Sequence, residues 1–383
     1  MAKLFGTPEL YHGVGSLSEL KNVKGKKAVI VIGGSSVVKN GSLQKVEALL
    51  DEAGLQHTVF SGVEPDPSIA TVRRGAALFA EFEPDWVIGL GGCSAIDAAK
   101  AMWALYEHPE LPFETMTQVG GVPPLRNKAR FIAIPSTSGT GTEITALAVI
   151  TDRENNVKYP MVSYEFIPDI SIVDGELCKS MPADVTANTG LDALTHSVEA
   201  YVSNIDDNYA DAFAKGGIQL IFDNLKQAVA EPQNEIVRQN MHDASCLGGY
   251  AFTNAWLGIA HSMAHQIGAT FGIPHGCANA IVLPSVIRFN AVSTGRYADL
   301  AHLLGKNNSE DFAVAVEQLR AEVNVASSVK EWGVEAEAWN RELKRMAQQA
   351  MADPCTGFNP RELKLEEMEQ LFVAVYNGEK VDF

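Results

Sequence analysis

The first half of this chain alternates short runs of β-branched and aromatic residues with amphipathic segments, and this alternation restricts the chain to few folds. Strands are expected at residues 26–34, 57–63, 85–92, 130–136 and 169–174. Between them lie segments with helical spacing of apolar residues: one ends at Gly54, one runs from Ser68 to about Phe82, and one opens at Ser94. Repeated strand–helix–strand units predict a mainly parallel sheet covered by helices.

The pattern changes near Pro182. Beyond this residue, long segments with a 3.6-residue period follow one another, and runs of β-branched residues nearly vanish. A length of 383 residues is also two to three times the commonest domain size. We therefore predict an α/β domain over residues 1–181 and an all-helical domain over residues 182–383.

Charge and composition exclude several classes of function. The chain has 30 Lys and Arg against 47 Asp and Glu, and its densest basic stretches, 24–27 and 126–130, are short. This argues against a nucleic-acid or membrane partner. The start of the chain lacks a signal peptide, and no segment approaches ~18 apolar residues, so a cytoplasmic location is expected. The five cysteines contain no CxxC pair, which favours reduced thiols.

A glycine-rich segment, residues 88–100, lies between an apolar strand and a helical run. It contains Gly91, Gly92, Cys93 and Ser94, of which Ser94 is the expected N-cap. Glycines allow a pyrophosphate to approach the main chain, and a helix N-terminus supplies free N–H groups. The segment matches neither GxGxxG nor the P-loop, so an ordinary tight turn is the alternative.

A second loop, residues 134–145, follows the next strand and is rich in hydroxyl groups that can hold phosphate or ribose. Its small residues are Ser136, Thr137, Ser138, Gly139, Thr140 and Thr142. Open α/β sheets bind ligands at the carboxyl ends of neighbouring strands. The two loops together therefore predict a nucleotide site.

Four histidines and an aspartate fall into two groups in the second half. Asp192 and His196 are spaced i, i+4, as are His261 and His265, and His275 follows Pro274, where a helix is expected to have ended. Three imidazoles and one carboxylate from two helices and a loop would suit Fe(II), Zn(II), Co(II) or Ni(II). The alternatives are satisfied core histidines and an HExxH zinc hydrolase, but Ser262 follows His261 where the hydrolase needs its glutamate.

These motifs, together with residues 181–201 and 254–276, resemble the signatures of the iron-dependent (group III) alcohol dehydrogenases. The resemblance runs from near residue 5 to beyond residue 361, and stretches such as 102–111 look most similar to the alcohol dehydrogenase half of bifunctional aldehyde–alcohol dehydrogenases. It implies a dehydroquinate-synthase-like architecture, in which the α/β domain binds a dinucleotide and the helical domain carries the metal. It also implies hydride transfer between NAD(P)(H) and short primary alcohols or aldehydes.

The resemblance assigns roles to individual residues. The metal ligands would be Asp192, His196, His261 and His275, holding Fe(II) or, as an alternative, Zn(II), and His265 would lie beside the substrate as a candidate proton relay. The cofactor contacts would be Gly34, Ser36, Asp66, Gly91, Gly92, Cys93, Ser94, Asp97, Ser136, Thr137, Thr140, Thr145 and Lys158. Two residues depart from the family pattern: Cys93 replaces a glycine, and Thr142 replaces the serine before Glu143.

Substrate and cofactor preferences are also expected. The uncharged segment 248–261 includes Phe252 and Trp256, which predict an apolar pocket for short alcohols, although core packing is the alternative for each. In the turn after the first predicted strand, NAD-using relatives carry an aspartate where this chain has Gly34, so we expect NADP(H) to be preferred over NAD(H).

The resemblance implies a homodimer or larger homo-oligomer. A non-redox lyase of the dehydroquinate-synthase type is the first competing function, but a polyanionic substrate would need basic residues near the metal, and only Lys215, Lys226 and Arg238 lie between Asp192 and His275. A non-catalytic nucleotide sensor is the second.

Overall fold

The computed structural model describes residues 3–155 and 157–383 and divides into two compact units. The first unit runs to Thr137 and resumes over Gly141–Ser180, and the second comprises Ser138–Thr140 and Met181–Phe383. The hydroxyl-rich loop thus contributes three residues to the second unit, although the strands on both sides of it belong to the first.

The first unit is built on a six-stranded sheet whose strands all run parallel, in the order β1-β8-β5-β4-β2-β3. The strands are β1 (Glu9–His12), β2 (Lys27–Ile32), β3 (Gln56–Phe60), β4 (Trp86–Gly91), β5 (Arg130–Pro135) and β8 (Ile170–Val173). The predicted parallel sheet is confirmed. After β2 the chain moves to one side, to β3, and β4 then returns to the other side of β2, so the strand order reverses between β2 and β4.

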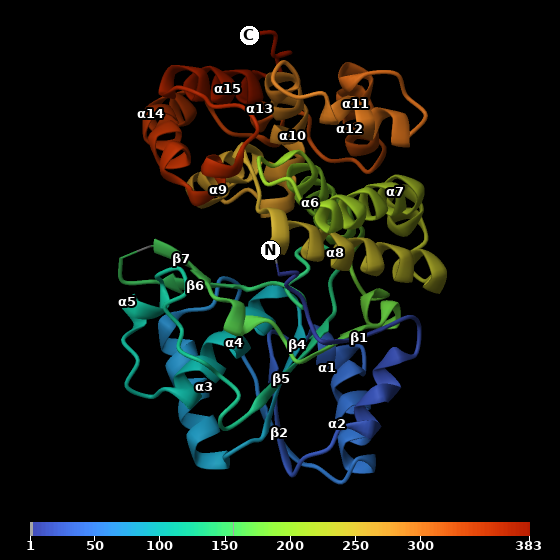
Figure 1. Cartoon of the computed structure of the whole chain (residues 1–383), viewed down its shortest axis with the longest axis vertical. Coiled ribbons are helices and arrows are strands. Elements are labelled where there is room, and N and C mark those ends of the chain that lie inside the picture. Colours follow the sequence, from blue (N-terminus) through green and yellow to red (C-terminus); the bar gives the residue numbers. More distant parts are fainter. Residues whose placement is uncertain (1–2, 156) are drawn as a thin grey trace. The chain divides into compact units, whose positions relative to one another are not determined.

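Alternation along β2 divides its side chains between two apolar layers. Ala28 and Ile30 join the cluster that includes residues of η1 (Ser16–Asn22) and α2 (Ser42–Glu52), whereas Val29 and Val31 join the cluster of α3 (Ile69–Phe82) and α4 (Cys93–Glu107). Figure 1 shows α2 on one side of the sheet and α3 and α4 on the other. Both faces of the sheet are therefore covered, as parallel sheets require.

Smaller elements complete the first unit. They are α1 (Ser36–Lys39), α5 (Phe113–Met116), η2 (Tyr164–Phe166), η3 (Gly175–Cys178) and the antiparallel pair β6 (Leu147–Asp152) and β7 (Val157–Val162). The sequence analysis did not predict β1 or the β6–β7 pair. The N-cap prediction for Ser94 is wrong: Gly92, in an extended conformation, is the N-cap, and α4 begins at Cys93.

All regular elements among the described residues of the second unit are helices. They are α6 (Ala183–Val202), α7 (Asn208–Ala230), α8 (Glu235–Ala255), α9 (Ile259–Phe271), α10 (His275–Ala291), α11 (Arg296–Leu303), α12 (Ser309–Glu322), α13 (Val329–Trp332), α14 (Ala336–Ala352), η4 (Pro354–Phe358) and α15 (Leu365–Asn377). The helical character predicted for the second half is confirmed.

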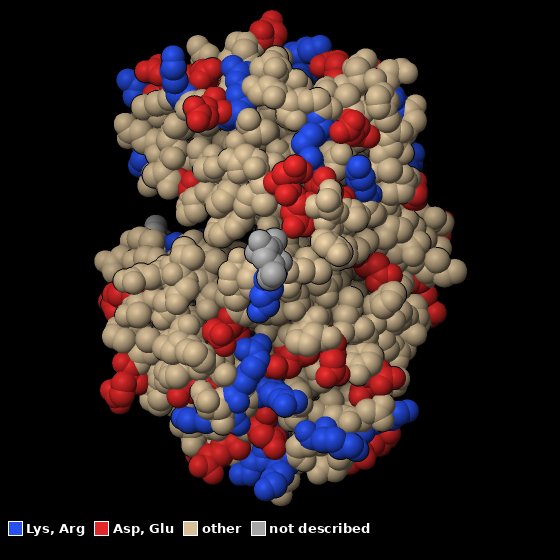
Figure 2. Space-filling view, in the orientation of Figure 1, with Lys and Arg blue, Asp and Glu red and all other residues tan. Residues whose placement is uncertain are grey.

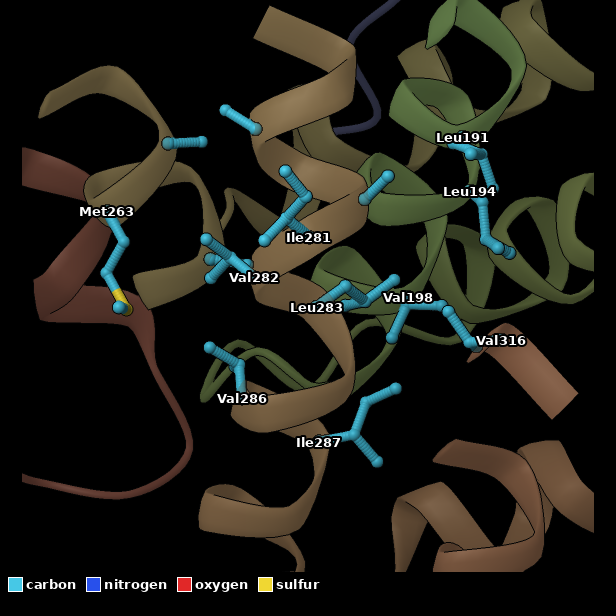
Figure 3. Close-up of a cluster of buried hydrophobic side chains, with 14 of the residues drawn as sticks. Leu191, Leu194, Val198, Met263, Ile281, Val282, Leu283, Val286, Ile287 and Val316 are labelled. Atoms are coloured by element: carbon cyan, nitrogen blue, oxygen red, sulfur yellow. The ribbon is translucent and has the colours of Figure 1, made fainter. Parts of the chain in front are cut away.

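Helix α10 lies at the centre of the second unit. Nearly all of its residues from Gly276 to Asn290 are buried, and a helix that is apolar on all sides is typical of a core position. Figure 3 shows Ile281, Leu283 and Ile287 of α10 among side chains from α6 and neighbouring helices. This packing fixes α6 and α10 relative to each other.

Charged side chains of both signs lie on the surface. On the face drawn in Figure 2, Lys and Arg side chains are interspersed with Asp and Glu. Among the described residues, no helix is long and apolar enough to cross a membrane. The five cysteines are free, and three of them are buried.

Candidate metal centre and nucleotide-binding loops

The second unit brings together the four residues predicted as metal ligands. Asp192 and His196 lie one turn apart on α6, His261 is on α9, and His275 is the first residue of α10. One ligand atom from each lies within 4.8 Å of the others. The prediction that His275 lies in a loop is wrong, because Pro274 is the N-cap of α10 and starts this helix. Three helices, not two and a loop, therefore supply the group.

Local sequence explains this convergence. On α6, Leu191 and Leu194 pack into the core (Figure 3), which fixes the helix around Asp192. At the start of α10, a Cβ atom on Gly276 would lie 2.0 Å from the carbonyl oxygen of Asn188. Only glycine permits this close approach, and it places the neighbouring His275 with its Nε2 atom 3.5 Å from Oδ1 of Asp192.

The electrostatics of the group favour binding of a cation. Burial alone would raise the pKa of Asp192, but the nearby His196, His275 and His261 hold it below its usual value. Burial, reinforced by His196 and His275, lowers the pKa of His261 well below 6.5. A charged Asp192 carboxylate beside the neutral imidazole of His261 suits a divalent transition metal, because such metals bind deprotonated ligands.

A buried atom without a hydrogen-bond partner also favours a metal ion at this group. The Nδ1 atom of His196 is buried without a hydrogen-bond partner, and it lies 4.0 Å from Oδ2 of Asp192. Buried polar atoms are normally paired, so this unpaired imidazole nitrogen beside a carboxylate is costly unless an ion occupies the group. The residues present therefore fit a metal ion held by three imidazoles and one carboxylate.

Two residues predicted for the substrate pocket have different surroundings. The ring of Phe252, on α8, stacks on the ring of His196 at 4.6 Å between centroids, so it borders the metal group directly. Trp256 follows α8 with a φ of 64° and stacks on Phe358 at 4.5 Å.

The predicted proton relay, His265, also borders the group. Its ring stacks on that of His275 at 5.4 Å, and its side chain is 41% exposed. Its Nδ1 atom lies 2.8 Å from Oδ2 of Asp353, which is the residue between α14 and η4. A carboxylate in this position fixes the orientation of the imidazole.

The sequence analysis missed three polar residues around the metal group: Glu199, Asn279 and Asp353. Glu199 is 2% exposed and bonded to His261, and burial raises its pKa to about 7. Asn279 is fully buried, with its amide nitrogen 2.8 Å from Oδ1 of Asp192. Both lie one turn after a predicted ligand on an apolar helix, Glu199 after His196 and Asn279 after His275, and this spacing was the signal that could have identified them.

The first unit gathers the predicted nucleotide loops at the carboxyl ends of adjacent strands. Gly34 and Ser36 follow β2, the Gly91–Ser94 turn follows β4, and Ser136 and Thr137 follow β5. The amide of Ser136 donates to the carbonyl oxygen of Gly91 at 2.8 Å, which ties the last two loops together. Because the strand order reverses between β2 and β4, these loops lie where open α/β sheets bind their ligands.

Residue Gly91 shows why this turn needs glycine. Its φ is +144°, and an added Cβ atom would lie 3.1 Å from that of Ala95. The turn leads into α4, whose N-cap, Gly92, offers no side chain to the first amide groups. The positive end of a helix at such a glycine turn favours an anion.

A buried lysine shapes the second loop. Nζ of Lys100 donates to the carbonyl oxygens of Thr142, Thr145 and Leu147 at 2.7, 2.9 and 3.0 Å. Asp97 accepts hydrogen bonds from the Thr142 hydroxyl at 2.7 Å and from the Val149 amide at 2.9 Å. Lys100 and Asp97, both buried on α4, therefore anchor this loop to the helix. Asp97 and Thr145, which were both predicted to contact the cofactor, are themselves buried.

The other predicted cofactor residues have different partners. Lys158, on β7, and Asp66, in the turn before α3, form an ion pair at 2.7 Å. Thr140 belongs to the second unit, as do its neighbours Ser138 and Gly139. The hydroxyl of Ser138 lies 3.0 Å from Nδ1 of His242, on α8.

Comparisons with known proteins agree with this architecture. The family model described as "Iron-containing alcohol dehydrogenase" matches residues 7–175, and "Fe-containing alcohol dehydrogenase family, C-terminal" matches residues 186–376. The chain is 48% identical to an NADPH-dependent butanol dehydrogenase of Clostridium saccharobutylicum, with 98% of each chain covered.

Two further similarities extend this result. The chain is 37% identical to the bifunctional aldehyde-alcohol dehydrogenase AdhE of Escherichia coli over 92% of its own length, but it spans only 43% of that protein. Its fold matches the solved structure of an iron-containing alcohol dehydrogenase from Thermococcus thioreducens with a TM-score of 0.92 and 34% identity, covering 98% of this chain and 100% of that one.

Proposed function

The chain belongs to the iron-containing alcohol dehydrogenase family, and we propose that it interconverts short primary alcohols and aldehydes with NADP(H), using one Fe(II) ion per chain. The observation that carries this proposal is the convergence of Asp192, His196, His261 and His275 within 4.8 Å. A non-catalytic nucleotide sensor would not require such a group.

The four side chains of the metal group would hold the ion through one carboxylate and three neutral imidazoles. A divalent ion bound there supplies Lewis-acid polarisation of an alcohol or aldehyde oxygen. Zn(II) is the alternative occupant, because this donor set does not discriminate strongly between the two metals.

The cofactor preference is supported by the turn after β2 and by one relative. Gly34, Ser35 and Ser36 are exposed and uncharged, and Lys39 follows within α1. Such a turn offers room and donors to a 2′-phosphate and lacks the acidic side chain that would repel it. The Clostridium saccharobutylicum relative is named as NADPH-dependent. We therefore assign NADP(H) as the preferred cofactor.

The pyrophosphate would lie against the Gly91–Ser94 turn, with ribose and nicotinamide near the 136–145 loop. Asp97 would act there indirectly, because its carboxylate accepts its hydrogen bonds from Thr142 and Val149 and is 3% exposed. Lys158 and Asp66 remain proposed contacts at the edge of the site, where their ion pair is about half exposed.

The substrate would be apolar and small. Phe252 borders the metal group through His196, and an apolar wall contributes roughly 0.8 kcal/mol for each CH₂ group that it buries. Trp256 is kept as a second wall residue of the same segment. We expect butanol and butanal to be better substrates than ethanol and ethanal.

His265 would carry a proton between the alcohol oxygen and solvent. The support is its half-exposed side chain beside His275 and its hydrogen bond to Asp353. Exchange of the proton with solvent needs an accessible imidazole, and a fixed orientation needs a partner such as this carboxylate. Replacement of His265 by alanine should lower kcat and change its pH dependence, with no change in metal content.

Location and assembly belong to the same proposal. We place the enzyme in the cytoplasm as a homodimer or larger homo-oligomer without nucleic-acid or membrane partners. Light scattering at micromolar concentration tests the assembly, since a monomer would contradict it.

The test of the function is an anaerobic assay of the iron-loaded protein with NADPH and butanal, in which the absorbance of reduced nicotinamide is followed. Turnover that is lost with a chelator and restored by Fe(II) is expected. Absence of turnover with any short aldehyde or alcohol, by a protein that binds both metal and NADPH, would contradict the proposal. It would leave the lyase or the nucleotide sensor as the explanation.

A further inference from the structure

A buried glutamate connects the two helices that carry three of the proposed ligands. Glu199 lies on α6, three residues after His196, and is 2% exposed. Its carboxylate accepts hydrogen bonds from the amides of Ala260 and His261 at 2.7 and 3.3 Å, and it lies 2.5 Å from Nδ1 of His261. These contacts tie α6 to the start of α9.

The start of α9 depends on this carboxylate. The N-cap of α9 is Gly258, which has no side chain to accept the free N–H groups of the first turn. Glu199 accepts two of them from another helix, and its negative charge is favourable at a helix N-terminus. An added Cβ atom on Gly258 would lie 2.9 Å from Oε1 of Glu199, so the glycine and the glutamate are sterically matched.

The contact with the ring of His261 has a chemical consequence. A carboxylate can only accept, so the proton of the neutral imidazole must be on Nδ1 for this hydrogen bond to form. The lone pair is then on Nε2, which is directed towards the metal group, 3.9 Å from Oδ1 of Asp192. A fixed tautomer and a more basic ring both strengthen a histidine as a ligand.

We propose that Glu199 is a positioning residue of the metal centre: by accepting a hydrogen bond from the Nδ1–H group of His261 and capping α9, it sets the affinity of the site for its metal ion. This inference rests on the proposed function, because it assumes that the group of four holds the ion.

A matched control is available in the first unit. Glu107, at the end of α4, is also buried, and its carboxylate accepts hydrogen bonds from the amides of Asn127, Lys128 and Ala129 at 2.9 to 3.0 Å. Replacement of Glu107 by glutamine therefore removes the same charge from the same kind of backbone contact, without a histidine.

The experiment compares Glu199→Gln with Glu107→Gln and the wild type, with Co(II) as the probe metal. Dissociation constants are measured by competition with a chelating dye, and the Tm of each metal-free protein is recorded. We expect the dissociation constant to rise at least about tenfold for Glu199→Gln and to stay within roughly twofold for Glu107→Gln. Both variants should lower the Tm of the metal-free protein.

Unchanged Co(II) affinity in Glu199→Gln would overturn the proposal. Failure of the metal centre itself would look different, because the wild type would then bind no Co(II), or His275→Ala would bind it as tightly as the wild type. Should Glu199→Gln not fold, the ¹⁵N shifts of His261 in the metal-free wild type decide: a proton on Nδ1 supports the proposal, and a proton on Nε2 overturns it.

Discussion

The amide nitrogen of Asn279 lies 2.8 Å from Oδ1 of Asp192, and it also lies 3.1 Å from Nε2 of His261 and 3.2 Å from Nε2 of His275. One fully buried amide thus contacts an atom of three of the four proposed ligands. Its hydrogen bond helps to hold the pKa of the Asp192 carboxyl below its usual value, against the effect of burial. In the metal-free protein, this donor offsets part of the cost of a buried negative charge.

This contact leads to the first prediction. Replacement of Asn279 by alanine should destabilise the metal-free protein by about 1.5–3 kcal/mol, the usual range for a hydrogen bond to a charged group. The deficit in Tm should shrink when Co(II) or Zn(II) is added, because the ion then compensates the charge. Asn290→Ala is the control: Asn290 is a buried amide on the same helix, bonded to Asn359. A deficit of equal size with and without metal in Asn279→Ala would contradict this account.

The second prediction concerns the ligand set itself. His275→Ala should lower the metal content of the purified protein and weaken metal affinity by about ten- to a hundredfold or more. Elemental analysis of the wild type and the variant measures this directly. His302→Ala is a suitable control, because His302 is on α11 and bonds to the carbonyl oxygen of Asn307. Full metal content in His275→Ala would refute the assignment.

Much of this architecture could be predicted from the sequence because its signals are strong. All five predicted strands are present in the parallel sheet, since fully buried strands such as β4 are continuous apolar runs. The missed strands give weaker signals: β1 has only four residues at a sheet edge, and β7 is largely exposed. Edge and hairpin strands lack the apolar runs on which the predictions depended.

The site was harder to predict where one residue type occurs in two different structural contexts. Proline near a helix boundary can follow the end of one helix or precede the start of the next, and Pro274 precedes α10. Ser94 is of a residue type that favours the N-cap, but α4 begins at Cys93 and its N-cap is Gly92. The roles of Glu199 and Asn279 could not be predicted from neighbouring sequence, because each depends on a partner more than 60 residues away on another helix.

The third prediction is a pH dependence of stability in the first unit. Glu143 is 2% exposed, and its Oε1 atom has no hydrogen-bond partner. Burial raises its pKa from 4.5 to about 7, although its own backbone and Lys100 oppose this. The folded state therefore binds more protons than the unfolded state between these values, and the stabilising contribution present below pH 4.5 is lost as the pH rises through 7.

Replacement of Glu143 by glutamine should remove this dependence. A shift of this size corresponds to at most about 3 kcal/mol in the free energy of unfolding. Urea unfolding of both proteins at about pH 5 and pH 8 measures it, because the difference between wild type and variant cancels the other titrating groups. We expect Glu143→Gln to gain stability relative to the wild type at the higher pH. An identical change with pH in both proteins would show that Glu143 does not titrate in this range.

The fourth prediction addresses chain-length specificity. Phe252→Ala removes an apolar ring beside His196, and each CH₂ of the substrate that loses an apolar wall forfeits up to roughly 0.8 kcal/mol. Butanol has two more CH₂ groups than ethanol, so the ratio of kcat/KM for butanol to that for ethanol should fall by up to about fifteenfold. Phe213→Ala is the control, because the ring of Phe213 packs at a tilt against that of Tyr250 in the same unit, with 5.0 Å between centroids. An equal loss with both alcohols would mean that Phe252 serves only to pack against His196.

The last prediction concerns the choice between NADP(H) and NAD(H). Gly34 is exposed, follows β2, and has no atom within 4 Å of the position that a Cβ would occupy, so a side chain can be added there without a steric clash. Gly34→Asp would add a carboxylate that repels the 2′-phosphate of NADPH and can accept a hydrogen bond from the ribose 2′-hydroxyl of NADH. In the wild type we expect kcat/KM to favour NADPH at least about tenfold, which equals ~1.4 kcal/mol. In Gly34→Asp the preference should reverse. Gly34→Asn is the matched control, since it has the same size without the charge and should retain the preference for NADPH. Comparable kcat/KM for the two cofactors in the wild type would disprove the assignment, whereas a reversal in both variants would attribute the choice to size, because only the aspartate changes the charge.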